Sequence, residues 1–113
     1  MEIARHSELV PFTTKDGSTI REYLHTSVQS LAEATLEPGQ ATERHYHRLA
    51  EEIYLITDGG GLLEIDGEER EVAAGDAILI PPGAWHTLRA GAAGTRLLCC
   101  CVPAYSHDDT YFA

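Results

Sequence analysis

The chain has 113 residues, which is long enough for one domain with a buried core, residues 1–113, and too short for a second. It carries 8 Lys and Arg residues against 18 Asp and Glu residues, and the formal net charge of −10 at pH 7 disfavours binding to nucleic acid or to an anionic membrane surface. No apolar run approaches the ~20 residues of a membrane-spanning helix, and the N-terminus lacks the hydrophobic core of a secretory signal, so we expect a cytoplasmic protein.

Two strands are predicted early in the chain, after a turn at residues 15–18. Residues 19–24 and 28–36 alternate between two faces, as strands do. Along the first strand and the start of the second, several side chains that can bind a ligand project, either into a pocket or onto a solvated outer face. These candidates for a pocket lining are Arg21, Tyr23, His25 and Gln29.

The segment 39–59 contains the first half of a candidate metal site. His45 and His47 are one residue apart, and on an extended chain such residues point to the same side, so their imidazoles can aim at one point. Glu52 opens an apolar run with the composition of a strand and can add an oxygen ligand. Glu51 is the alternative oxygen ligand, but the Ile-Tyr-Leu-Ile run at 53–56 and the gap of six residues before Gly59 favour Glu52. Two nitrogens and an oxygen form half of a metal site.

Residue 54 is a candidate for a catalytic role. Tyr54 lies two residues beyond Glu52 on the same face of the predicted strand at 52–57, so it should point into the same cavity. There its hydroxyl could donate a proton or a hydrogen bond. The alternative is ordinary packing inside the protein.

A hairpin is expected between the two halves of the site. Residues 58–61 are predicted to form a glycine-rich turn, and Asp66-Gly67 is a strong hairpin signal between strands at 62–65 and 68–72.

The segment 75–90 contains the second half of the site. A short strand at 77–80 leads into Pro81-Pro82-Gly83, a turn that fixes where the following residues emerge. His86 can then join the first two imidazoles, while Trp85 should point away from them.

Consecutive cysteines occupy the last predicted strand. Strands are expected at 85–89 and 96–102, with a small-residue loop at 90–94 between them. The spacing of Cys99, Cys100 and Cys101 fits neither a zinc framework nor a disulfide scaffold, so we interpret them as small hydrophobic residues. The alternative is a redox or catalytic role, because Cys99 and Cys101 share a face that could line the interior.

The C-terminal tail, residues 103–113, departs from the strand pattern. Its Asp and His residues form either a second ion site or a solvated acidic segment. Its three aromatic residues indicate that it docks, over the mouth of a barrel or on a partner subunit.

The two halves of the site resemble the paired signature of the cupins, small β-barrel proteins. The matching positions, in order, are Gly39, His45, His47, Glu52 and Gly59, followed by Gly75, Pro81, Gly83 and His86. The chain departs from the family pattern at Ala90, where the second motif usually has an asparagine that serves mostly as a turn residue. The resemblance implies an all-β fold, an antiparallel β-barrel or jelly roll with little helix, and the many short strands point the same way.

Three imidazoles and one carboxylate suit one divalent transition metal ion, namely Mn, Fe, Ni, Co, Cu or Zn. The resemblance allows dioxygenase, decarboxylase or isomerase chemistry on a small polar molecule. The alternatives are a non-catalytic module that binds a small ligand or a metal, and a metal that only stabilises the fold. Because small cupins are often dimers, we also expect a homodimer.

Overall fold

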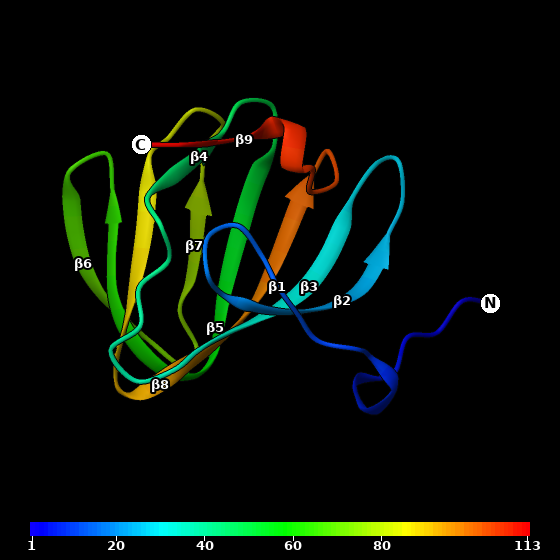
Figure 1. The fold of residues 1–113 in the computed structure, drawn as a ribbon, viewed down its shortest axis with the longest axis horizontal. Coiled ribbons are helices and arrows are strands. Elements are labelled where there is room, and N and C mark those ends of the chain that lie inside the picture. Colours follow the sequence, from blue (N-terminus) through cyan, green and yellow to red (C-terminus); the bar gives the residue numbers. More distant parts are fainter.

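The computed structural model describes residues 1–113 as strands and two short 3₁₀ turns, without an α-helix (Figure 1). In chain order the elements are η1 (His6–Glu8), β1 (Phe12–Thr13), β2 (Thr19–His25), β3 (Ser30–Leu36), β4 (His45–His47), β5 (Glu51–Ile65), β6 (Glu68–Ala73), β7 (Ala77–Ile80), β8 (His86–Val102), η2 (His107–Asp109) and β9 (Thr110–Phe112). The predicted all-β fold with little helix is confirmed. The structure contains no helix with the length and apolar character needed to span a lipid bilayer.

The strands form one antiparallel sheet that curls on itself. Its order is β1-β2-β3-β8-β4-β9, and β5 joins β8 to β6 and β7. The long strands β5 and β8 pair along most of their length, so they form the spine of the fold. Both bend, and the bend turns the rest of the sheet over the inner face (Figure 1).

Two predicted interruptions were wrong, because the segments 58–61 and 90–94 lie within continuous strands. In β5 the pairing with β8 continues across 58–61, with shifts of register between Ile56 and Asp58 and between Gly59 and Gly61. At the second shift, from the Gly59–Thr95 pair to the Gly61–Ala90 pair, residues 91–94 of β8 have no partner on β5 and form a bulge. The glycines here are needed for close approach: a Cβ on Gly61 would collide with the carbonyl oxygen of Arg89 on β8. The small residues therefore allow a sharp bend in a paired strand where the sequence suggests a turn.

The inner face of the sheet holds the core. Fully buried Leu36, Ile56, Ile80, Leu88 and Leu97 come from four different strands that meet there. β5 shows the alternation most clearly, since its residues from 51 to 56 are exposed and buried in turn. Burial of these side chains contributes about 1.5–3 kcal/mol each.

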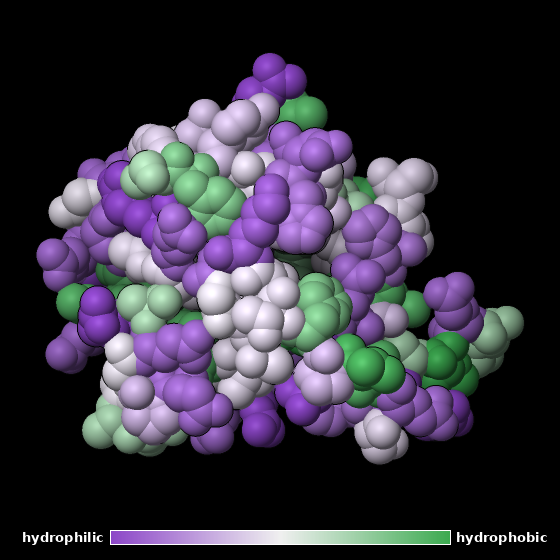
Figure 2. Space-filling model, viewed as in Figure 1, coloured by the Kyte–Doolittle hydropathy of each residue, from purple (hydrophilic) through white to green (hydrophobic).

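On the outer face, one row of neighbouring strand residues is apolar. We call Leu31, Cys100, Ile53 and Leu79, which pair in that order across β3, β8, β5 and β7, the outer apolar row. Ile53 is 44% exposed and Leu79 is 55% exposed. On the face of the molecule seen in Figure 2, hydrophilic residues dominate and hydrophobic residues occur in small separate groups.

The tail forms a strand, which the sequence pattern did not predict. β9 pairs with β4, so that Phe112 lies opposite His45 and Thr110 lies opposite His47. The Asp109 carboxylate accepts hydrogen bonds from the backbone N–H groups of Leu49 and Ala50 at 2.8 and 3.0 Å, which fixes the loop after β4. The predicted docking of the tail is therefore onto this chain's own β4.

Candidate metal site

Three histidines converge inside the curled sheet. His45 and His47 come from β4, and His86 comes from the start of β8, where it pairs directly with His45. All three are buried, and their ligand nitrogens lie within 4.8 Å of one another. Each imidazole points inward because residues i and i+2 of β4 share a face and the turn before β8 aims His86 at that face.

Hydrogen bonds fix which nitrogen of each ring faces the centre. His45 Nδ1–H donates to the Glu43 carbonyl at 2.7 Å, and His86 Nδ1–H donates to the Ala84 carbonyl at 2.9 Å. A carbonyl can only accept, so the proton of each neutral ring lies on Nδ1 and Nε2 keeps its lone pair. This is the tautomer that a histidine ligand requires.

His47 receives the same support from the tail. Its Nδ1 lies 3.1 Å from Thr110 Oγ1, and that hydroxyl donates its own proton to the Ser106 carbonyl at 2.9 Å. The hydroxyl oxygen is therefore left as an acceptor for the His47 Nδ1–H.

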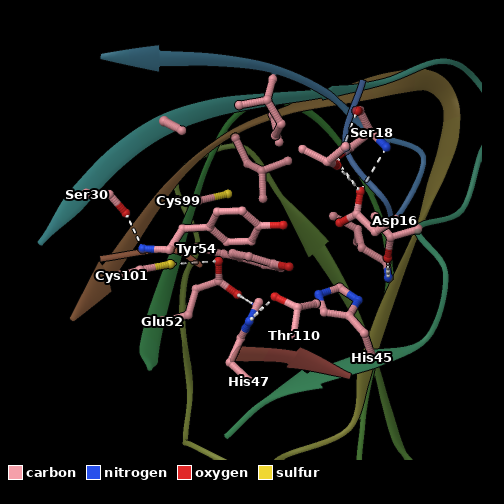
Figure 3. Close-up of a pocket in the computed structure, with 18 of the residues that line it drawn as sticks. Asp16, Ser18, Ser30, His45, His47, Glu52, Tyr54, Cys99, Cys101 and Thr110 are labelled. Atoms are coloured by element: carbon pink, nitrogen blue, oxygen red, sulfur yellow. Dashed lines mark hydrogen bonds and ion pairs between the residues drawn. The ribbon is translucent and has the colours of Figure 1, made fainter. Parts of the chain in front are cut away.

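Glu52 brings a carboxylate to the same point. Its Oε1 lies 3.6 Å from His47 Nε2 and 3.5 Å from His86 Nε2, and its Oε2 accepts a hydrogen bond from the Cys101 thiol at 3.3 Å. Figure 3 shows Glu52, His47 and His45 gathered at one end of a cavity. Glu51, the alternative oxygen ligand, is exposed on the other face of β5.

Two of these converging atoms have no hydrogen-bond partner, although both are buried. They are Glu52 Oε1 and His86 Nε2. Leaving such atoms unpaired costs about 1–3 kcal/mol each, and with the imidazole protons on Nδ1 these two atoms present lone pairs to one another. A cation between them removes the conflict, so these residues fit a divalent transition metal ion.

The protonation states suit a cation. Burial would raise the pKa of Glu52, but hydrogen bonds and positive charge from His47 and His86 in their protonated forms outweigh it and bring the pKa to about 2, so the ionised carboxylate depends on positive charge beside it. Burial and then the neighbouring His86 lower the pKa of His45, which favours its neutral form. The site therefore offers an ionised carboxylate at Glu52 and, at His45, an imidazole whose neutral form is favoured.

A partly open cavity of about 70 Å³ lies beside these residues. His45, His47, Glu52 and Tyr54 line it, together with apolar residues such as Leu36, Leu88 and Leu97. Tyr54 points into the cavity, as its position after Glu52 predicts, and burial followed by the Glu52 charge raises its pKa, so the phenol stays protonated. Trp85 lies away from the cavity, against Tyr46 and Arg44.

Of the two alternatives for the ligand-binding side chains of β2 and the residues after it, the outer face is the one that the structure shows. None of Arg21, Tyr23, His25 and Gln29 lines the cavity. The opposite face of β2 points inward instead and presents Ile20 and Glu22, with Ser18 just before the strand. The alternation was correctly predicted, but it did not reveal which face was buried.

Two cysteines line the cavity as thiols. Cys99 and Cys101 face inward and Cys100 faces out, as their alternation requires. Burial and then the Glu52 charge raise the pKa of both inward thiols, so neither is a thiolate. Cys101 differs from a simple packing residue in its contact with Glu52.

Sequence reasoning missed two functional candidates. Thr110 was part of a tail without a strand pattern, and its contact with His47 spans 63 residues. Asp16 was assigned only to a turn, yet its carboxylate lines the cavity. The Asp-Gly-Ser composition marked the turn correctly but contained no signal for the direction of the side chain.

Comparisons with known proteins agree with this architecture. The profile of the cupin domain matches residues 32–101, more than half of the chain. An uncharacterized protein of Methanocaldococcus jannaschii is 45% identical over 111 residues, covering 93% of this chain and 89% of that one. A dimethylsulfoniopropionate lyase of Ruegeria pomeroyi is 40% identical over 63 residues, covering 56% of this chain and 41% of that one.

Among solved structures, KdgF from Halomonas sp. has the same fold. It superimposes with a TM-score of 0.85 at 19% identity, covering 96% of this chain and 97% of that chain. Together with the profile match and the geometry of β4, β5 and β8, these likenesses show that the chain belongs to the cupin family.

Proposed function

We propose that the chain is a metal-dependent enzyme acting on a small polar molecule, with one divalent transition metal ion held by His45, His47, Glu52 and His86. The observation that carries the proposal is the pair of buried unpartnered atoms, Glu52 Oε1 and His86 Nε2, among imidazoles whose Nδ1 protons are already engaged. When bound, such an ion would act as a Lewis acid or a redox centre toward a substrate oxygen.

The position of the site favours catalysis or ligand binding over a purely structural metal. His45, His47 and Glu52 line the cavity, so a ligand inside it would meet the metal site directly. A structural ion is normally enclosed by four protein ligands away from any pocket.

Tyr54 is the chain's own candidate for handling a proton of the substrate. Its hydroxyl makes no hydrogen bond to another protein group and borders the cavity beside Glu52. A phenol in that position can donate a hydrogen bond or a proton to a substrate oxygen. This role favours isomerase or lyase chemistry, and the likeness to a dimethylsulfoniopropionate lyase over part of the chain points the same way. Dioxygenase and decarboxylase chemistry remain the other proposals from the family.

The test combines metal analysis with a search for turnover. We expect the purified protein to contain about one transition metal ion per chain and His47→Ala to contain much less. A panel of small hydroxy and keto compounds, incubated in D₂O and followed by proton NMR, would reveal proton transfer as exchange of C–H for deuterium. Oxygen consumption would reveal a dioxygenase.

Two variants separate the alternatives. Tyr54→Phe should keep the metal and lose most of the exchange, whereas His47→Ala should lose both and remain folded. A protein that takes up no metal would refute the proposal. If His47→Ala instead lowers the unfolding temperature sharply and no compound reacts, the metal is structural.

A further inference from the structure

The charged groups that line the cavity are all acidic. They are Asp16, Glu22 and Glu52, and no Lys or Arg lines it. Glu22 contributes least to the charge inside the cavity, because its side chain is 36% exposed to solvent and its Oε2 lies 3.2 Å from His25 Nδ1. Glu52 belongs to the candidate metal site. Asp16 therefore sets the charge of the part of the cavity that a ligand would occupy.

Asp16 is held rigidly and presents one free oxygen. Its Oδ1 accepts hydrogen bonds from the Thr14 hydroxyl at 2.6 Å, from the Ser18 hydroxyl at 2.6 Å and from the Ser18 backbone N–H at 2.9 Å. No protein group donates to Oδ2. These bonds stabilise the turn before β2 and keep the carboxylate on the cavity wall.

A second polar group faces this oxygen. Tyr54 is only 5% exposed, yet its hydroxyl has no partner in the protein. In Figure 3 the Tyr54 hydroxyl and the Asp16 carboxylate point toward one another across the cavity. The Tyr54 hydroxyl opens onto the cavity, so a ligand group between Tyr54 and Asp16 could accept a hydrogen bond from the phenol and donate one to the free Asp16 oxygen.

The cavity has room for a small ligand. Its volume of about 70 Å³ is several times the ~10–15 Å³ that one water needs. A molecule of a few non-hydrogen atoms therefore fits without rearrangement of the walls.

We propose that Asp16, opposite Tyr54, determines the substrate class of the cavity: a small uncharged or cationic molecule that presents a hydroxyl or amino group to Asp16. A ligand that places a carboxylate or phosphate at that end is rejected, because it meets a fixed negative charge with no cationic side chain on the cavity wall. The inference rests on the proposed function for the identity of the metal-holding residues on the wall of the same cavity, and in Figure 3 Asp16 lies beside one of them, His45.

The test uses glycolamide and glycolate, two probes of five non-hydrogen atoms that differ in charge. Ligand-observed NMR titrations at pH 8 would give the affinity of each probe for the zinc-loaded protein and for the metal-free protein. The key variant is Asp16→Asn, whose amide oxygen can still accept from Thr14 and Ser18. The matched control is Asp58→Asn, which makes the same change of net charge at an exposed position.

We expect Asp16→Asn to raise the affinity for glycolate relative to glycolamide by about tenfold or more, and Asp58→Asn to leave this ratio unchanged. A tenfold change in this affinity ratio equals the repulsion between two unit charges about 12 Å apart at an effective dielectric constant of 20. Two groups in the same cavity lie closer together than that, so we expect at least this effect. The metal-free wild-type protein should already bind glycolamide more tightly than glycolate, and this comparison does not depend on the folding of any variant.

An unchanged ratio in Asp16→Asn would overturn the inference, and so would tighter binding of glycolate by the metal-free wild-type protein or no binding of either probe. Failure of the proposed function looks different, because metal uptake is measured separately. A protein that takes up no zinc but prefers glycolamide would refute the metal site and leave the role of Asp16 intact.

Discussion

Replacing Thr110 by valine should weaken metal binding although Thr110 is not itself a ligand candidate. Valine matches threonine in shape but cannot accept the hydrogen bond that His47 Nδ1–H donates to Thr110 Oγ1 at 3.1 Å. Both residues are buried, with His47 4% and Thr110 8% exposed, so water cannot easily replace the lost partner. An unsatisfied buried donor costs about 1–3 kcal/mol.

The histidine can escape this cost by moving its proton to Nε2. That nitrogen faces Glu52 Oε1 at 3.6 Å, so the new tautomer would place a proton where the metal belongs. Loss of a group that orients a metal-binding histidine typically lowers metal affinity by about 10–100-fold, and we expect Thr110→Val to fall in this range. Thr110→Ser retains the hydroxyl and should bind metal nearly as the wild type does.

Competition between the protein and a chromophoric chelator for zinc would measure the affinity of each variant. Thr42→Val is the matched control, because the buried Thr42 hydroxyl accepts a hydrogen bond from the backbone N–H of Leu88 and makes none to a histidine. This control should lose stability but keep its zinc affinity. Equal zinc affinities of Thr110→Val, Thr110→Ser and the wild type would show that the tail does not orient His47.

Three further predictions concern the metal, the fold and the assembly. Cys101→Ala removes the thiol that donates a hydrogen bond to Glu52 and should weaken zinc binding by about tenfold. Cys101→Ser restores a donor, so recovery of zinc affinity in that variant would show that the hydrogen bond matters and not the packing. An unchanged zinc affinity in Cys101→Ala would show that Cys101 does not position Glu52. Gly61→Ala should lower the free energy of unfolding in urea by about 1–3 kcal/mol, because its methyl group would collide with the backbone of β8. Gly91→Ala, where the nearest backbone atom is 3.3 Å away, should cost much less, and equal losses would contradict the explanation of the bend. We expect the outer apolar row to form a homodimer interface, so light scattering should show a dimer that Ile53→Glu or Leu79→Glu converts to a monomer; a monomeric wild type would refute this.

The local part of the candidate site could be predicted from the sequence, because it depends on short-range geometry. Alternation along a strand puts His45 and His47 on one face, and it separates Glu52 from Glu51. The Pro-Pro-Gly turn before β8 has few conformations open to it, which limits where His86 emerges.

The remaining features depend on contacts between distant segments. Thr110 reaches His47 only because β9 pairs with β4, and the sequence of the tail contains no alternation strong enough to reveal that strand. The inward face of β2 is determined by what packs on it, and the pattern of Arg21 and Tyr23 against Ile20 and Glu22 is mixed on both faces. Glycines likewise mark both turns and close approaches, so the bend at Gly61 could not be distinguished from a turn.

The most direct test of the metal site is anomalous X-ray scattering from crystals of the protein purified with its metal. We predict one strong anomalous peak, at about 2.0–2.2 Å from the Nε2 atoms of His45, His47 and His86 and from a carboxylate oxygen of Glu52. A peak elsewhere in a metal-containing protein, or well-ordered imidazoles whose Nε2 atoms bond only to water, would contradict the account.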